Sequence, residues 1–180
     1  MIVVSICSIT TASADSADAT YLGHKKCKMC HFKLYKSWAE TKMAKAFELL
    51  KPGVRPEAKK KANLDPDKDY TSDTNCLKCH VTGYGEPGGF TSVEATPHLL
   101  GVQCESCHGP GIEYSKVMKN NKSYKIAEVT TTGLVSPVTA DKCTRCHNTD
   151  SPFVGDDYKF DFEKRKEEGT HEHFPLKYEH

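Results

Sequence analysis

The chain has 180 residues, of which 37% are hydrophobic, and its 25 basic and 24 acidic residues leave a formal net charge of +1. Beyond the N-terminal segment, no apolar stretch approaches the roughly 18 residues that a membrane-spanning helix needs, so we expect no membrane span. The balanced charge gives no reason to expect a nucleic-acid partner. The length suits one domain.

The N-terminal segment has the pattern of a secretory signal peptide. An apolar run at residues 2–9 precedes two small-residue cleavage sites, which end at Ala14 and Ala19. The pattern is imperfect because no lysine or arginine precedes the apolar run. We therefore predict a signal peptide over residues 1–19, cleaved after Ala14 or Ala19, export to the periplasm, and a single domain over residues 20–180.

Residues 32–50 (FKLYKSWAETKMAKAFELL) have the spacing of an amphipathic helix. The apolar residues that recur every four positions are Tyr35, Ala39, Met43 and Phe47. Lysine and glutamate occupy the opposite face, and Pro52 and Gly53 follow the segment. The pattern predicts one continuous helix that ends before Pro52.

The rest of the chain predicts short helices and a large share of loop. The expected elements are a basic helix over 55–65, loop over 81–103, a turn or short helix over 112–122, a small hairpin over 123–139 and a helix over 157–169. Gly109 and Gly111 flank a proline and end any helix there. We expect a mainly α fold with much irregular loop.

Eight of the nine cysteines form four repeats of the pattern Cys-x-x-Cys-His. The repeats are Cys27, Cys30 and His31; Cys76, Cys79 and His80; Cys104, Cys107 and His108; and Cys143, Cys146 and His147. This is the attachment pattern of c-type haem. The two thiols form thioethers with the haem, and the adjacent histidine reaches the iron from the same face.

Structural zinc and disulfides are the alternative interpretations of the same cysteines. A zinc ribbon uses paired cysteines but has no need of a histidine after each pair. A thioredoxin-type dithiol would occur once, before a helix of a βαβ unit. Four histidines at the same place in four motifs therefore favour four covalently bound haem c groups.

The haem groups are expected to form the apolar centre of the molecule. The chain is too poor in hydrophobic residues to bury a conventional core. Burial of a large flat apolar group contributes about 25 cal/mol per Å² of apolar surface. We therefore expect the polypeptide to wrap around four haems and the apoprotein to be largely unfolded.

The motif histidines supply one axial ligand each, and several residues are candidates for the opposite side of each iron. The remaining candidates are His24, His98, His171, His173, His180, Met43 and Met118. Met43 lies 12 residues after His31, about 18 Å along a helix, which is too far for both to bind one haem. Met43 therefore either binds a different haem or only packs in the interior.

Three longer stretches resemble the tetrahaem cytochrome c-554 family, nitrifier-type periplasmic cytochromes of ammonia-oxidising bacteria. They read KKCKMCHFKLYKSWAETKMAKAFELLKPGV, LDPDKDYTSDTNCLKCHVTGYGEPGGF and LLGVQCESCHGPG. The resemblance covers residues 24–111 almost without gaps and resumes at Cys143 and at the HEH stretch, residues 171–173. It implies a mainly α-helical, haem-packed fold and electron transport in the periplasm.

The resemblance also implies distal axial ligands. His171 would complete the haem of His147. The family has histidines where this chain has Met43, facing the haem of His108, and Met118, facing the haem of His31. Both replacements are to methionine, the other common haem ligand, so we predict mixed His/His and His/Met ligation.

The haem of His80 has an open distal side in the family. The neighbouring family sequence Thr-Pro-Phe corresponds here to Ser151, Pro152 and Phe153. His98 lies in a loop from which it could close this side. The resemblance thus implies a distal pocket in which a small gas ligand such as nitric oxide could bind.

These features favour an electron carrier over an enzyme or a subunit of a larger haem assembly. The alternative is a redox enzyme acting on nitric oxide or hydroxylamine at an open five-coordinate haem. Residues 21–62 hold 12 basic and three acidic residues, whereas residues 148–180 hold five basic and nine acidic ones. The basic N-terminal segment is either a solvated helix face or a docking surface for a redox protein.

Overall fold

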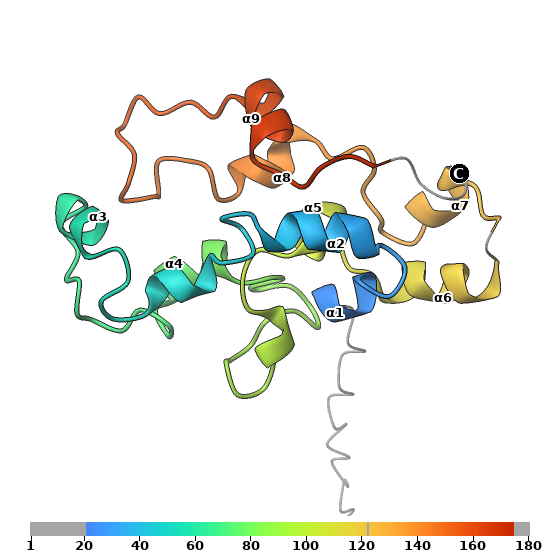
Figure 1. Ribbon diagram of the computed structural model, residues 1–180, viewed down its shortest axis with the longest axis horizontal. Helices are drawn as coiled ribbons and strands as arrows, with labels where there is room; N and C mark the ends of the chain where they lie inside the picture. The colour runs from blue at the N-terminus through green and yellow to red at the C-terminus, as the bar shows by residue number, and fades with distance from the viewer. Residues whose placement is uncertain (1–20, 122, 175–180) are drawn as a thin grey trace, which may run out of the picture.

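The computed structural model describes residues 21–121 and 123–174, so the predicted signal peptide lies outside the described part. It consists of short helices joined by long loops (Figure 1). The elements are α1 (His24–Cys27), α2 (Phe32–Ala39), η1 (Phe47–Leu50), α3 (Pro56–Lys61), α4 (Thr74–His80), η2 (Pro97–Leu99), α5 (Cys104–His108), α6 (Ile112–Asn120), α7 (Ile126–Thr130), α8 (Ala140–Thr144) and α9 (Phe162–Glu168). The described residues form no strand, only an isolated bridge between Val81 and Leu100. The predicted mainly α fold with much loop is confirmed.

The predicted continuous helix over residues 32–50 is wrong. Helix α2 ends at Ala39, and turns separate it from η1. The hydroxyl of Thr41 donates to the carbonyl of Trp38 at 2.7 Å and accepts from the N–H of Ala44 at 3.3 Å. This local bonding gives the backbone an alternative to the helical ladder, so the chain turns where apolar spacing alone predicts more helix.

The predicted hairpin over residues 123–139 is also wrong, because α7 occupies part of this segment. The carboxylate of Glu128 accepts from the N–H of Lys125 at 3.3 Å at the start of the helix. Three threonines near its end donate to carbonyls three residues earlier: Thr130, Thr131 and Thr132. These bonds satisfy backbone groups in a helical turn, although threonine is frequent in strands.

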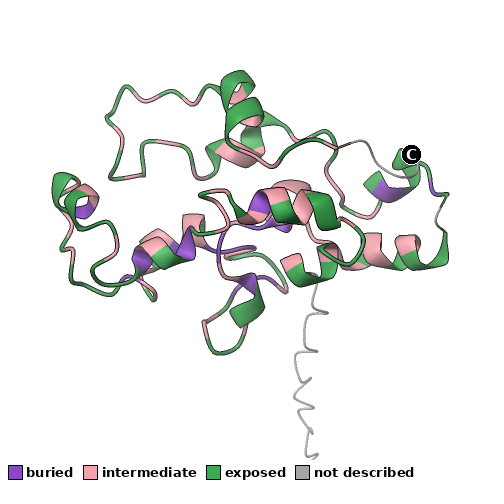
Figure 2. Cartoon of the chain, in the orientation of Figure 1, coloured by how far each residue is buried: buried purple, intermediate pink, exposed green. Residues whose placement is uncertain are grey.

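The buried apolar residues lie mainly in the N-terminal half. One cluster joins η1, α4 and the loop before α5, and consists of Tyr21, Phe47, Leu50, Tyr70, Leu77, Val81, Phe90 and Leu99. By contrast, no residue from 130 to 174 is buried, as the lack of purple in this part of the chain shows (Figure 2). Side-chain packing therefore gives the C-terminal third little stability of its own.

None of the helices in the described ranges combines the length and the apolar character needed to cross a membrane.

The C-terminal third should depend on attachment of a haem at the fourth motif. In a Cys143→Ala, Cys146→Ala variant, we expect trypsin to cleave within residues 130–174, because no residue there is buried. The cluster between Phe47 and Leu99 should stay protected. Limited proteolysis with mass spectrometry measures both. The matched control is Cys27→Ala, Cys30→Ala, and equal protection of residues 130–174 in the wild type and the first variant would contradict the prediction.

Candidate functional site

Each Cys-x-x-Cys-His motif lies on a helical turn. The first and fourth motifs overlap the ends of α1 and α8, whereas α4 and α5 contain the second and third motifs completely. The N–H of His31 bonds the carbonyl of Cys27, and that of His147 bonds the carbonyl of Cys143, both at 2.9 Å. Residues i, i+3 and i+4 share one helix face. Both thiols and the imidazole of each motif can therefore meet one flat group.

Three of the motifs surround a cavity of about 740 Å³. The motif residues in its wall are Cys76, Cys79, His80, Cys107, Cys143, Cys146 and His147. Apolar side chains such as Met43, Leu50 and Val81 line it as well. An apolar cavity with thiols and imidazoles in its wall fits large apolar groups held by sulfur and nitrogen, so these residues fit haem.

The imidazoles of His80 and His108 are oriented by backbone carbonyls. Nδ1 of His80 lies 2.6 Å from the carbonyl oxygen of Ala46, and Nδ1 of His108 lies 3.0 Å from that of Val135. When Nδ1 carries a proton and donates it to the carbonyl oxygen, Nε2 presents a lone pair that can bind a metal. Burial lowers the pKa of both histidines and so favours the neutral form that binds iron.

The first motif's histidine lies in a group of hydroxyls. Nε2 of His31 is 3.1 Å from the hydroxyl of Tyr114, which in turn is 3.2 Å from the hydroxyl of Tyr124. Tyr114 belongs to α6, and Met118 lies four residues later on the same helix face. Met118 is half-buried. The structure thus brings the helix that carries Met118 to the first motif.

Met43 lies in the turn between α2 and η1 and lines the cavity together with Cys107. Its carbonyl accepts the N–H of Val102, just ahead of the third motif, at 3.1 Å. The helix break after Ala39 thus brings Met43 next to the third motif.

His171 lies against the third motif. Its ring centroid is 6.3 Å from that of His108, with 27° between the planes. Its Nδ1 lies 2.9 Å from the carbonyl oxygen of Glu172. The ring of His147, which the resemblance pairs with His171, stacks on Phe160 at 4.6 Å. In the described part of the chain, the ring of His171 contacts the rings of His108 and His173.

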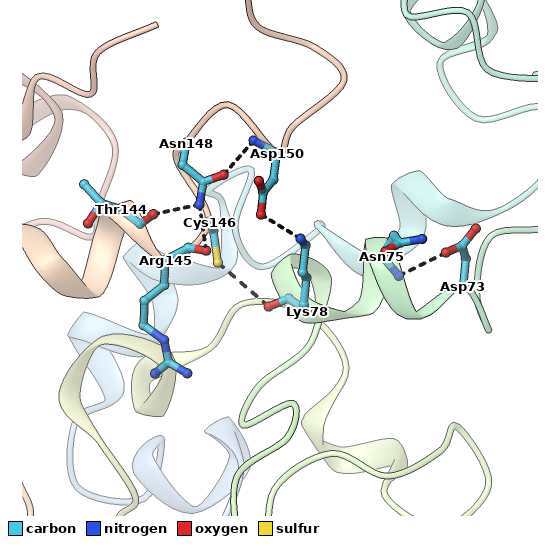
Figure 3. Close-up of polar contacts among 8 residues, drawn as sticks. All are labelled: Asp73, Asn75, Lys78, Thr144, Arg145, Cys146, Asn148 and Asp150. Carbon is cyan, nitrogen blue, oxygen red and sulfur yellow. Dashed lines mark hydrogen bonds and ion pairs between the residues drawn. The ribbon is translucent and has the colours of Figure 1, made fainter. Parts of the chain in front are cut away.

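Ser151, Pro152 and Phe153 line the same cavity as His80. The residue before them, Asp150, forms a 2.9 Å ion pair with Lys78 of the second motif (Figure 3).

The fourth motif contacts the second motif through the same lysine. The thiol of Cys146 points at the carbonyl of Lys78, at 3.9 Å (Figure 3). Asn148 closes the turn after the motif, because its amide donates to the carbonyls of Thr144 and Arg145. These contacts bring the segment of Ser151 to the second motif.

His98 lies outside this cavity. Its side chain is exposed, and its carbonyl accepts from the side chain of Gln103 at 2.8 Å. It is not among the described residues that line the cavity.

The thiols reveal which motifs are neighbours. A hydrogen bond to Cys104 raises the pKa of Cys27, and a hydrogen bond to Cys146 lowers the pKa of Cys79 to about 7. In the haem-bearing protein these sulfurs are thioethers and do not titrate, but the bonds place the first motif beside the third and the second beside the fourth.

The third and fourth motifs are neighbours as well. Burial raises the pKa of Cys107 to about 11, and the nearby thiol of Cys143 adds to the shift. Helices α5 and α8 are also in contact. The four motifs therefore follow one another in space in the order first, third, fourth, second.

The chain is similar to known proteins of one family. The family described as "Cytochrome c554 and c-prime" matches residues 26–109. Cytochrome c-554 of Nitrosomonas europaea is 50% identical over 111 residues, which is 62% of this chain and 47% of that protein. The solved structure of the reduced state of cytochrome c554 from Nitrosomonas europaea superposes with a TM-score of 0.76 at 36% identity, and the match covers 89% of each chain.

The chain belongs to the cytochrome c554 family. The predicted family, its helical fold and its complement of four covalently bound haem c groups are thereby confirmed. The alignment with the curated relative spans about half of that relative's length.

This member of the cytochrome c554 family has a buried carboxylate that sequence reasoning missed. Glu105, inside the third motif, is only 5% exposed. Its oxygens accept from the backbone N–H groups of Leu22, Gly23 and Gly111 at 2.7 to 3.1 Å. The carboxylate thus ties the chain just before the first motif to the third motif. An acidic residue in a short helix gives no sequence signal for burial, because acidic residues are usually exposed.

Gln103 reinforces the same junction and was also missed. It is 2% exposed, accepts from the N–H of His24 at 2.6 Å and donates to the carbonyls of His98 and Leu100. Both residues hold the first and third motifs together without touching the proposed ligands.

Replacement of Glu105 by glutamine should destabilise the protein. An amide keeps the shape but loses the charge and one acceptor, so we expect a loss of about 1.5–3 kcal/mol in the free energy of unfolding. Denaturant unfolding of the haem-bearing protein measures this loss. The control is Glu113→Gln, an exposed partner of Lys116 at 2.6 Å, for which we expect less than about 1 kcal/mol. Equal losses for both variants would contradict the role of Glu105.

Proposed function

We propose that this chain is a periplasmic tetrahaem c-type cytochrome that carries electrons between redox proteins. The observation that carries the proposal is the continuous order of the four motifs: α5 of the third motif contacts α1 of the first and α8 of the fourth, and Cys146 of the fourth contacts Lys78 of the second. When bound, each haem supplies a reversible one-electron iron couple. The chain's own contribution is to hold the four attachment points in sequence and to exclude water around them.

The motif residues hold the haems in this proposal. The attachment residues are Cys27, Cys30, Cys76, Cys79, Cys104, Cys107, Cys143 and Cys146, and the proximal iron ligands are His31, His80, His108 and His147. The hydrogen bonds from His80 to Ala46 and from His108 to Val135 support this role, because they leave Nε2 free to bind iron.

Met43 and Met118 are proposed as distal ligands, for the haems of His108 and His31 respectively. The position of Met43 in the cavity wall with Cys107 supports the first assignment. The position of Met118 one turn after Tyr114 supports the second, since Tyr114 contacts His31. A thioether favours ferrous iron, so both assignments imply higher potentials than bis-histidine ligation gives.

His171 is proposed as the distal ligand for the haem of His147, as the family resemblance implies. Its ring contact with His108 would then place ligands of the third and fourth haems side by side. This arrangement fits the neighbouring positions of those two motifs.

A second function is proposed for the haem of His80, at the end of the row of motifs. The segment Ser151–Phe153 lines the cavity near His80, and no described histidine or methionine is assigned to the distal side. A small neutral ligand such as nitric oxide suits an apolar pocket of this kind better than a charged one. This site is the basis of the alternative in which the protein also performs redox chemistry on a gas.

Replacement of the two methionines should change the haem spectrum in a specific way. Ferric haem with a methionine ligand has a near-infrared charge-transfer band, which we expect in the wild type at neutral pH. The band should disappear in a Met43→His, Met118→His double variant, and two reduction potentials should fall because imidazole stabilises ferric iron better than a thioether does.

Met29→His is the matched control for this experiment. Met29 is 78% exposed and belongs to no proposed ligand pair, so the band and the potentials should stay as in the wild type. Absence of the band from the wild type would refute the methionine assignments.

The open site is tested by counting high-spin haems with electron paramagnetic resonance, with and without nitric oxide. We expect one high-spin haem per chain, and its signal should change when nitric oxide binds. Phe153→Ala should speed nitric oxide binding by widening the pocket, whereas Phe32→Ala, at another exposed phenylalanine, should not. A fully low-spin spectrum would exclude the open site and leave the carrier function intact.

A further inference from the structure

We infer that the first motif is the docking point for an acidic redox protein, which contacts an apolar centre formed by Met29 and Phe32 and a surrounding ring of lysines. This inference rests on the proposed electron-carrier function. It specifies where electrons cross between proteins and what kind of surface the partner presents.

Apolar side chains at the first motif are open at the surface. The neighbouring apolar side chains are unusually open, with Met29 78% and Phe32 57% exposed. The helix of the first motif contacts that of the third, which contacts that of the fourth, so an electron that enters at the first motif has a path to the others.

Five exposed lysines lie within four residues of this apolar centre in the chain: Lys25, Lys26, Lys28, Lys33 and Lys36. No aspartate or glutamate occurs between residues 21 and 39. Within residues 21–121 and 123–174, none of the five forms an ion pair with a carboxylate. Their charges are therefore available to a partner.

Lysines elsewhere on the surface show the contrast. Lys51, Lys60, Lys116 and Lys166 each pair with a glutamate three residues earlier. Such pairing neutralises the local field, whereas the lysines around the first motif act together. The charge difference along the chain thus corresponds to a basic patch whose lysines form no ion pair with a described carboxylate.

Lys28 links the charge to the apolar centre. Its ammonium group lies 5.9 Å from the ring centre of Phe32 and 4.9 Å from that of Tyr35. The lysine therefore extends across the aromatic rings and keeps its charge at the rim. An apolar centre with a charged rim is the usual anatomy of a transient protein interface.

An acidic protein with an apolar centre of its own fits this surface best. Opposite charges speed diffusional encounter by 10- to about 1,000-fold at low ionic strength, and the apolar contact fixes the docked position at short range. A membrane of anionic lipid is the other negatively charged surface that five lysines could meet, and the experiment below separates the two.

The test measures reduction of the haem-bearing protein by reduced plant-type ferredoxin, a small acidic electron carrier, in stopped-flow experiments. Lys25→Glu, Lys28→Glu, Lys33→Glu should lower the second-order rate constant at least about 10-fold at low salt, and the difference should shrink at high salt. The matched control is Lys61→Glu, Lys159→Glu, Lys164→Glu, which makes the same change in net charge at exposed positions elsewhere. We expect the control to change the rate constant by less than about threefold.

Phe32→Ser tests the apolar centre. It should lower the rate constant at both low and high salt, because apolar contact is not screened. Ile126→Ser, at another exposed apolar residue that is 41% exposed, is its control. Haem content and reduction potentials of every variant must match those of the wild type. A lower rate constant can then be attributed to weaker docking of ferredoxin.

The outcomes are distinct. Equal slowing by the two triple variants would overturn the inference. Binding of the wild type to phosphatidylserine vesicles, lost in the first triple variant while its ferredoxin rate stays normal, would overturn it in favour of a membrane contact. Failure of sodium dithionite to reduce the wild-type haems and of oxygen to reoxidise them would refute the proposed function itself. Normal cycling with dithionite and no effect of the docking variants would refute the docking inference alone.

Discussion

Covalent attachment of haem to pairs of cysteines is the constraint on which the structure depends. The apolar cluster around Leu77 and Leu99 involves only the N-terminal half, and no residue from 130 to 174 is buried. In a chain of this kind the cofactors take the place of a side-chain core, and the polypeptide needs only short helices to present its thiols and imidazoles. The short helices and long loops are thus a consequence of binding four haem groups in one short chain.

The order of the four motifs in space differs from their order in the chain, and it decides which haems lie at the two ends of the row. The first motif lies beside the third, the third beside the fourth and the fourth beside the second. The exposed lysine-rich end and the proposed gas-binding end are therefore the two ends of one row. In the proposed function, a large partner would exchange electrons at the first of these ends, and a small molecule would bind at the other.

The sequence predicted the cofactors well, because Cys-x-x-Cys-His is a local pattern in which the chemistry itself dictates the spacing. Helix ends were predicted less well. The turn after Ala39 depends on the hydroxyl of Thr41, and α7 depends on side-chain bonds such as that of Glu128, which hydrophobic spacing does not reveal. Glu105 was missed for a different reason, since two of its three partners lie 82 and 83 residues away in the chain, and only the fold brings them together.

The carboxylate of Glu105 has a consequence for how such a chain can diverge. It is held entirely by main-chain N–H groups, so its hydrogen bonds do not depend on the side chain at position 22, provided that Leu22 does not become proline, which lacks the donor. Gly23 is restricted for another reason: its φ of +74° and the carbonyl oxygen of His98, 2.7 Å from where a Cβ would stand, leave no room for a side chain. Substitutions should therefore accumulate at position 22 while positions 23 and 105 stay fixed, although neither of them touches an iron ligand.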